Sequence, residues 1–172
     1  FGKLFVQTEI LPEQHALLCT KRPRSAEEQT PWSFHLLATN GTQVTQVSYE
    51  TDRVKFIGRG RTLVAPQALI SSGDLSGNQG SVLDPIVAIR CFITLEAEQS
   101  ATLMFISGAA ASRHASMQLI EKYQDHHFSD RAFELAGTHS GVTLRQINAS
   151  ETDAQLYRRL ASHVIYGNST LR

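Results

Sequence analysis

The chain has 172 residues, and its 16 basic and 16 acidic side chains give a formal net charge of zero. That length fits one domain, or one domain with an appendage, around a proper core. The balanced charge argues against nucleic acid or anionic lipid as a partner, and no uninterrupted apolar run is long enough to span a membrane.

The first part of the chain alternates polar and apolar residues with the period of a strand. We predict strands over residues 4–10, 16–20, 32–39 and 44–49, and a charged, proline-bounded loop over residues 21–31. Asn40-Gly41 is a strong turn signal between the last two of these strands. Because the chain begins at Phe1 rather than at methionine, inside the first predicted strand, we expect it to be a piece of a longer protein.

Residues 49–66 concentrate charge, aromatic residues and glycine as no other segment does. Thr51 or Asp52 can cap a short helical turn, and Gly58 can close that turn in the left-handed conformation that other residues avoid. We expect three apolar side chains to attach this turn to the core. They are Val54, Phe56 and Ile57.

The Gly-Arg-Gly-Arg sequence that follows places Arg59 and Arg61 two residues apart, so an extended backbone directs both guanidinium groups to the same side. In one interpretation, the arginines of the segment pair with Glu50, Asp52 or Asp84 and hold a long loop on a sheet. In the other, the arginines and carboxylates bind a polar ligand such as a sugar hydroxyl array or an oxyanion. The candidate carbohydrate-binding residues are Glu50, Asp52, Arg53, Arg59 and Arg61.

The rest of the chain changes from the period of a strand to that of a helix. Residues 70–80 are rich in serine and glycine and predict a loop, and alternation over residues 87–95 and 102–107 predicts a long hairpin. Helical spacing follows over residues 115–123, from residue 133 to residue 147, and after Ser150. We therefore divide the chain into a β-rich part, residues 1–111, and a helical part, residues 112–172.

Side chains that could carry catalysis are scattered, and we assign no catalytic residue. His126 and His127 are the only close pair among seven histidines, and adjacent residues on a regular element point apart, so we predict neither a metal site nor a cofactor. His35 could pair with Glu50 for proton transfer; the alternative is a satisfied histidine on the polar face of a sheet. The two cysteines are expected to be free thiols.

Several motifs occur in a fixed order along nearly the whole chain. They are residues 5–9 (Phe-Val-Gln-Thr-Glu), 17–18 (Leu-Leu), 21–25 (Lys-Arg-Pro-Arg-Ser), 49–53 (Tyr-Glu-Thr-Asp-Arg), 56–61 (Phe-Ile-Gly-Arg-Gly-Arg), 82–86 (Val-Leu-Asp-Pro-Ile), 130–135 (Asp-Arg-Ala-Phe-Glu-Leu) and 154–161 (Ala-Gln-Leu-Tyr-Arg-Arg-Leu-Ala). Together they resemble the amino-terminal part of the phosphorylase module of glycoside hydrolase family 94, formerly glycosyltransferase family 36, in particular that of cyclic β-1,2-glucan synthases.

The resemblance implies a mainly β fold, an antiparallel supersandwich similar to galactose mutarotase, followed by linker helices that lead to an α/α barrel. In this family the catalytic aspartate and the phosphate site lie in the barrel, which we expect to lie outside these residues. The resemblance therefore implies a non-catalytic piece, inactive alone, that supports the barrel and lends loops to the rim of its active site.

The partners implied by the resemblance are the barrel domain and a glucan or glucose-1-phosphate type ligand held by the parent enzyme. A homodimer, formed through unpaired strand edges and apolar helix faces, is also open. The parent would be a glycosyltransferase or glycoside phosphorylase on the cytoplasmic side of the inner membrane, and we expect this piece alone to be soluble.

Two other functions stay open. An independent carbohydrate-binding module would need an exposed aromatic platform, whereas Trp32, the single tryptophan, lies on an apolar strand face. A saturable change in Trp32 fluorescence on titration with β-1,2-glucan would favour such a module. A mutarotase-like epimerase that uses His35 and Glu50 rests on fold analogy alone.

Overall fold

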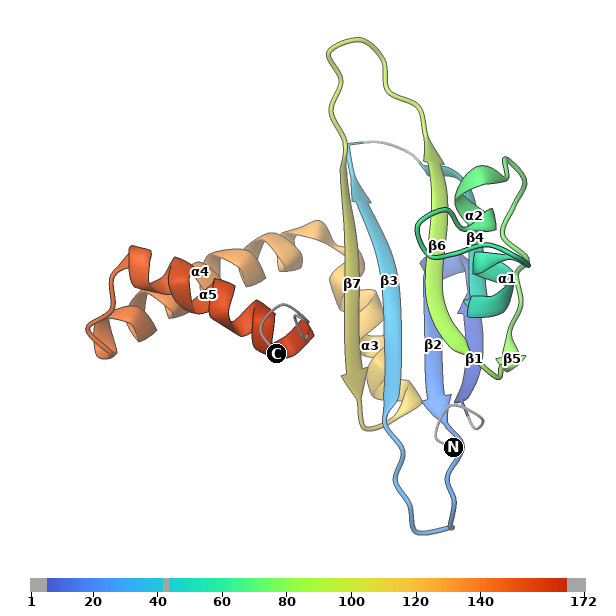
Figure 1. The fold of residues 1–172 in the computed structure, drawn as a ribbon, viewed down its shortest axis with the longest axis horizontal. Helices are drawn as coiled ribbons and strands as arrows, with labels where there is room; N and C mark the ends of the chain where they lie inside the picture. The colour runs from blue at the N-terminus through green and yellow to red at the C-terminus, as the bar shows by residue number, and fades with distance from the viewer. Residues whose placement is uncertain (1–5, 42–43, 167–172) are drawn as a thin grey trace. The chain divides into compact units, whose positions relative to one another are not determined.

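The computed structural model describes residues 6–41 and 44–166 of the chain. They form two compact units, Phe1–His126 and His127–Arg172. All the strands belong to the first unit, and the two longest helices make up most of the second (Figure 1). No helix within the described ranges combines the length and the apolar character that crossing a membrane requires.

The first unit contains two antiparallel sheets. The larger has five strands in the order β5-β1-β2-β3-β7, and the smaller pairs β4 with β6. The strands are β1 Val6–Leu11, β2 Ala16–Lys21, β3 Trp32–Asn40, β4 Val44–Asp52, β5 Gly80–Ser81, β6 Pro85–Ile93 and β7 Thr102–Ala110. The short 3-10 helix η2 (Pro12–Gln14) joins β1 to β2, which pair as the predicted hairpin. Residues 4 and 5 of the first predicted strand lie outside the described residues.

The strands β6 and β7 do not pair with each other, so the predicted long hairpin is wrong. β6 pairs with β4, whereas β7 pairs with β3 along its whole length, from Trp32 opposite Ala110 to Asn40 opposite Thr102. The consecutive strands β3 and β4 also belong to different sheets. Alternation identifies a strand but not its neighbour, because strands of both sheets share the same period of two. Both connections therefore pass from one sheet to the other.

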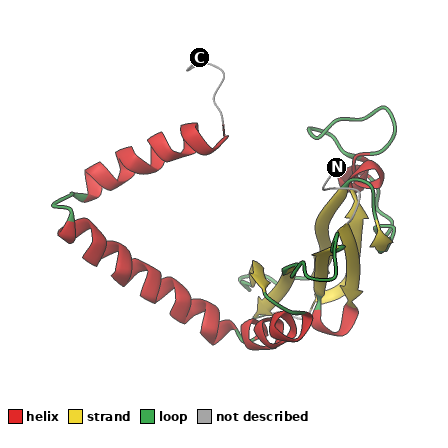
Figure 2. Cartoon of the chain, turned by 90° about the horizontal axis from the view of Figure 1, so that it is seen from below, coloured by secondary structure: helices red, strands yellow, loops and turns green. Residues whose placement is uncertain are grey.

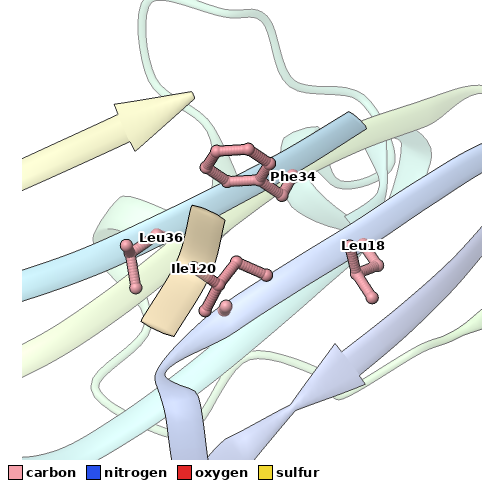
Figure 3. Packing of buried hydrophobic residues seen from close by; sticks show 5 residues of the cluster. Leu18, Phe34, Leu36 and Ile120 are labelled. Atoms are coloured by element: carbon pink, nitrogen blue, oxygen red, sulfur yellow. The ribbon is translucent and has the colours of Figure 1, made fainter. Parts of the chain in front are cut away.

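The helix α3 (Arg113–Gln124) packs on one face of the five-stranded sheet. Its residue Ile120 is fully buried in a cluster with Leu18 of β2 and with Phe34 and Leu36 of β3 (Figure 3). Removing side chains of this size from water contributes about 1.5–3 kcal/mol each. The apolar face predicted for the third strand is confirmed, and the first predicted helix covers it.

The other face of the five-stranded sheet is covered by the smaller sheet. Leu17 and Leu37 point away from α3, because they alternate with its contacts along β2 and β3, yet only 0% and 1% of their surfaces are exposed. On the same face, the hydroxyl of Thr8 in β1 donates a hydrogen bond to the hydroxyl of Thr51 in β4 at 3.0 Å. The first unit is therefore layered as helix, sheet and sheet.

The second unit consists of two helices joined by a short loop, α4 (His126–Gln146) and α5 (Glu151–Tyr166) (Figure 2). The predicted start of α5 is confirmed, since the Ser150 N–H donates to Asp153 Oδ2 at 2.8 Å and the Asp153 N–H donates to Ser150 Oγ at 3.2 Å. α5 carries an apolar stripe at every fourth residue. Leu156, Leu160 and Val164 of this stripe are 52%, 53% and 83% exposed.

Gly108 of β7 offers a test of the core packing, because a Cβ at this position would lie 2.5 and 2.6 Å from two carbons of the Phe34 ring. Since that ring is packed between the sheet and α3, we expect Gly108→Ala to lower the free energy of unfolding by about 1–3 kcal/mol in urea denaturation. The control is Gly73→Ala, whose Cβ would meet only Ser71 Oγ at 3.8 Å. Equal stability of the two variants would contradict the packing.

Candidate functional site

The carboxylate of Glu50 lies near the end of β4, where only 2% of the residue is exposed. Its Oε1 accepts hydrogen bonds from the backbone N–H groups of Thr51 and Asp52, both at 3.0 Å. Its Oε2 accepts a third from the Ser76 N–H at 3.3 Å. Because Ser76 belongs to the serine- and glycine-rich loop, Glu50 fastens that loop to the end of β4. The three N–H groups compensate the buried charge.

Two further candidates hold the segment that follows β4. Asp52 is the N-cap of α1 (Arg53–Ile57), and its Oδ1 accepts a hydrogen bond from the Val54 N–H at 2.9 Å. Arg53 Nη1 lies 3.4 Å from Asp84 Oδ2, and the Arg53 N–H donates to the Asp84 carbonyl at 3.0 Å. The Asp52 cap agrees with the cap predicted for this turn, and the Arg53–Asp84 contact is one of the ion pairs of the structural interpretation. Glu50 and Asp52 bind backbone N–H groups instead of the arginines.

The short helix α1 packs only partly as the sequence predicts. Gly58 ends it with a φ of 83°, as predicted, and a Cβ there would lie 2.6 Å from Gln67 Cβ. Phe56 and Ile57 are half-buried, but Val54 is 66% exposed, so its predicted contact with the core is wrong. In a helix of five residues the apolar side chains cannot all face one side.

Arg59 and Arg61 point into solvent. Both residues are exposed, and within the described part of the chain neither guanidinium has a hydrogen-bond or ion-pair partner. The structure therefore separates the five candidates: Glu50, Asp52 and Arg53 hold the chain in place, whereas the other two remain available to a ligand or another domain.

Sequence reasoning missed Arg90, in the middle of β6. Its guanidinium donates to the carbonyl oxygens of Ala68 at 2.7 Å and Ser71 at 3.1 Å, and also to that of Gly73. These carbonyls belong to α2 (Gln67–Ile70) and to the loop that follows it. The sequence did contain a signal for this role. Arg90 is a single charged residue among eight apolar residues of one strand, and a half-buried charge needs hydrogen-bond partners.

A pocket of about 280 Å³ lies between Glu50 and Arg90, the two side chains that bind the loop. Glu50 and Arg90 line it together with Lys55, Gln67 and Asp74. Both carboxylate oxygens of Glu50 and most N–H groups of Arg90 are already bonded to the backbone, whereas Lys55 and Gln67 are among the polar side chains this pocket offers to a ligand. Of the five predicted residues only Glu50 reaches it, and the structure does not gather them into one site.

The structure does not bring His35 to Glu50. Nδ1 of His35 lies 2.8 Å from the Ser107 hydroxyl on the neighbouring strand β7, and the imidazole stacks on the Phe105 ring with 5.8 Å between centroids. Burial lowers the pKa of His35 from its usual value of 6.5. His35 therefore fits the alternative given above, a histidine on a sheet whose ring is hydrogen-bonded to a neighbouring strand. The proton-transfer pair with Glu50 is not formed.

The three consecutive residues Asp125, His126 and His127 have potential ligand atoms within 4.8 Å of one another. The expectation that the two histidines point apart is therefore wrong. Two of the three residues are exposed, and groups of this kind are common on protein surfaces without an ion, so the cluster by itself assigns no metal site.

The family of the chain follows from comparison with known proteins. Residues 1–126, which include both sheets and α3, match the family model described as "Glycosyl hydrolase 94, supersandwich domain". The chain belongs to the glycosyl hydrolase 94 family. The two packed antiparallel sheets followed by helices agree with a supersandwich domain, so the fold class predicted from the sequence is confirmed.

The whole chain is also similar to a much longer protein, "Cyclic beta-(1,2)-glucan synthase NdvB" of Rhizobium meliloti (strain 1021). The two are 28% identical over 172 residues, which is the whole of this chain and 6% of that relative. The match continues beyond residue 126, so it includes the two helices of the second unit. The family resemblance found in the sequence motifs is confirmed.

Loss of the Glu50 charge should destabilise the supersandwich domain. In Glu50→Gln an amide NH₂ would face backbone N–H donors, so we expect the free energy of unfolding to fall by about 1–3 kcal/mol in urea denaturation. Glu27→Gln, at an exposed position in the loop after β2, should change it by less than about 0.5 kcal/mol. If both variants were equally stable, the carboxylate would not be what holds the loop.

The lowered pKa of His35 predicts a pH dependence of stability. The unfolded chain binds a proton at this histidine more readily than the folded chain, so stability is full above the unfolded pKa of about 6.5 and is lost as pH falls through the folded pKa. Between about pH 8 and pH 5, the unmodified domain should therefore lose more unfolding free energy than His35→Gln. Parallel pH profiles would refute this; His114→Gln, at an exposed position, is the control.

Proposed function

We propose that this chain is a non-catalytic supersandwich domain with linker helices that supports the catalytic barrel of a larger carbohydrate-active enzyme. The burial of Glu50 carries this proposal. Its carboxylate accepts three backbone hydrogen bonds and is 2% exposed, so it is not free to serve as an acid or base for a substrate. The other half of the imagined couple, His35, is bonded to a serine hydroxyl.

The larger enzyme in this proposal is a glycosyltransferase or glycoside phosphorylase that handles a β-1,2-glucan or glucose-1-phosphate. Two findings support it: the family of the domain, and the similarity of the whole chain to a protein named as a cyclic β-(1,2)-glucan synthase. Because the chain spans 6% of that relative, most of the enzyme's chemistry would be carried by other domains.

The rim of the active site is the proposed place of Arg59 and Arg61. Their exposed guanidinium groups have no partner within the described residues, and such forks can bind a sugar hydroxyl array or an oxyanion through two parallel hydrogen bonds. Glu50, Asp52 and Arg53 contribute by fixing the backbone on which the two arginines stand.

The apolar stripe of α5 is the proposed contact with the barrel. Leu156, Leu160 and Val164 are each more than half exposed at a spacing of four residues, and an apolar face of this kind is stable in water only when another element covers it. A second copy of the chain would cover the same stripe in a homodimer.

The isolated chain should show no turnover. Incubated with β-1,2-linked glucooligosaccharides and inorganic phosphate it should release no glucose-1-phosphate, and without phosphate it should release no glucose, as measured by coupled enzymatic assays. A reaction that occurs with the unmodified chain and disappears in Glu50→Gln or His35→Gln would overturn the proposal, since it would make those residues catalytic.

A further inference from the structure

A second pocket lies on the face of the five-stranded sheet that carries α3. Its volume is about 330 Å³, and side chains of four strands line it. Ser81 of β5 is paired with Gln7 of β1, Gln7 with Thr20 of β2, and Thr20 with Trp32 of β3. Directly paired residues project to the same side of a sheet, so these four side chains form one continuous row across the floor of the pocket.

The wall of the pocket is neutral in charge. Glu9, two residues after Gln7 on the same side of β1, lies beside the row. Its two carboxylate oxygens accept hydrogen bonds from Nε and Nη2 of Arg113, the first residue of α3. The pair cancels both charges, and no unpaired cation lines this pocket within the described residues. Phosphate and other anions therefore lack a counter-charge here.

Three of the four side chains in the row have unused hydrogen-bonding groups among the described residues, whereas the hydroxyl of Thr20 donates to the Pro31 carbonyl. Gln7 and Ser81 are exposed, and within the described part of the chain neither side chain has a hydrogen-bond partner. The indole N–H of Trp32 likewise has none there. Trp32 itself is half-buried, packs against the core cluster that includes Ile120 of α3, and lines the pocket.

An indole beside amide and hydroxyl groups, without net charge, fits a neutral polyhydroxylated ring. The apolar C–H face of a pyranose packs on an aromatic ring, and its hydroxyls take hydrogen bonds from the surrounding polar side chains. We propose that this row is a binding subsite for a glucosyl unit of a neutral glucan, with Trp32 as the platform and Gln7 and Ser81 as hydrogen-bonding partners. The choice of glucan rests on the proposed function.

This subsite differs from the exposed platform of an independent carbohydrate-binding module. It is a single half-buried ring in a pocket near the lower size limit of ligand sites, which are about 300–1,000 Å³. It would hold one unit of a long chain weakly and keep the glucan near the enzyme, while other domains carry out the reaction.

The test uses the single tryptophan of the chain as a reporter. Linear β-1,2-linked glucooligosaccharides are titrated into the 172-residue chain, and both the Trp32 fluorescence and its one indole N–H resonance are followed. We expect saturable shifts of both. Gln7→Ala should weaken the binding about fivefold, and the double variant with Ser81→Ala should weaken it further, since each change removes a hydrogen bond to the ligand.

The matched control is Gln118→Ala, which removes the same group from an exposed position on α3 outside the pocket and should bind as the unmodified chain does. No shift at millimolar glucan, equal affinity in Gln7→Ala and Gln118→Ala, or a shift produced by inorganic phosphate alone would overturn the subsite. Because none of these outcomes involves turnover, the subsite can fail while the non-catalytic role stands.

Discussion

Two charges of opposite sign, the buried carboxylate of Glu50 and the half-buried guanidinium of Arg90, hold the backbone of one loop, and the candidate site depends on them. The loop over residues 71–79 consists mostly of serine and glycine and brings few apolar side chains of its own. Its backbone polar groups must therefore find partners elsewhere. The carboxylate of Glu50 takes an N–H group of this loop, and the guanidinium of Arg90 takes carbonyl groups at its start. Both come from the smaller sheet, which makes that sheet the rigid support of the loop.

In the proposed role, the charged segment over residues 49–66 has both a structural and a functional part. Residues whose side chains are satisfied by the backbone fix the path of the chain, as Asp52 does at the start of α1. Residues that follow, such as Arg59, extend into solvent, and among the described residues their hydrogen-bonding groups have no partner. A backbone that is already fixed loses little conformational entropy of its own when the arginines on it bind a ligand. The proposed function depends on this contrast between fixed and exposed side chains.

Local order was readable from the sequence, and long-range pairing was not. Alternation located the strands, and the serine at position 150 with an aspartate three residues later located the start of α5, because these signals act within a few residues. The partner of β7 could not be read in this way, because alternation carries no information about which strand lies alongside. The role of Arg90 was hidden for the same reason: its carbonyl partners become neighbours only once the sheet has formed. The fold class was predicted from the order of the family motifs along the chain. That order reflects common ancestry and cannot be derived from the local properties of the residues.

The connections that pass between the sheets, among them those from β3 to β4 and from β6 to β7, also determine the order in which the protein can be completed during synthesis. β3 emerges from the ribosome well before β7, its partner on one side, and the whole smaller sheet is made in between. Pairing over such a separation is slow compared with local contacts. The edge of β3 that β7 will cover therefore stays unpaired while residues 41–101 are being translated. Chaperone binding would prevent aggregation most effectively during this interval.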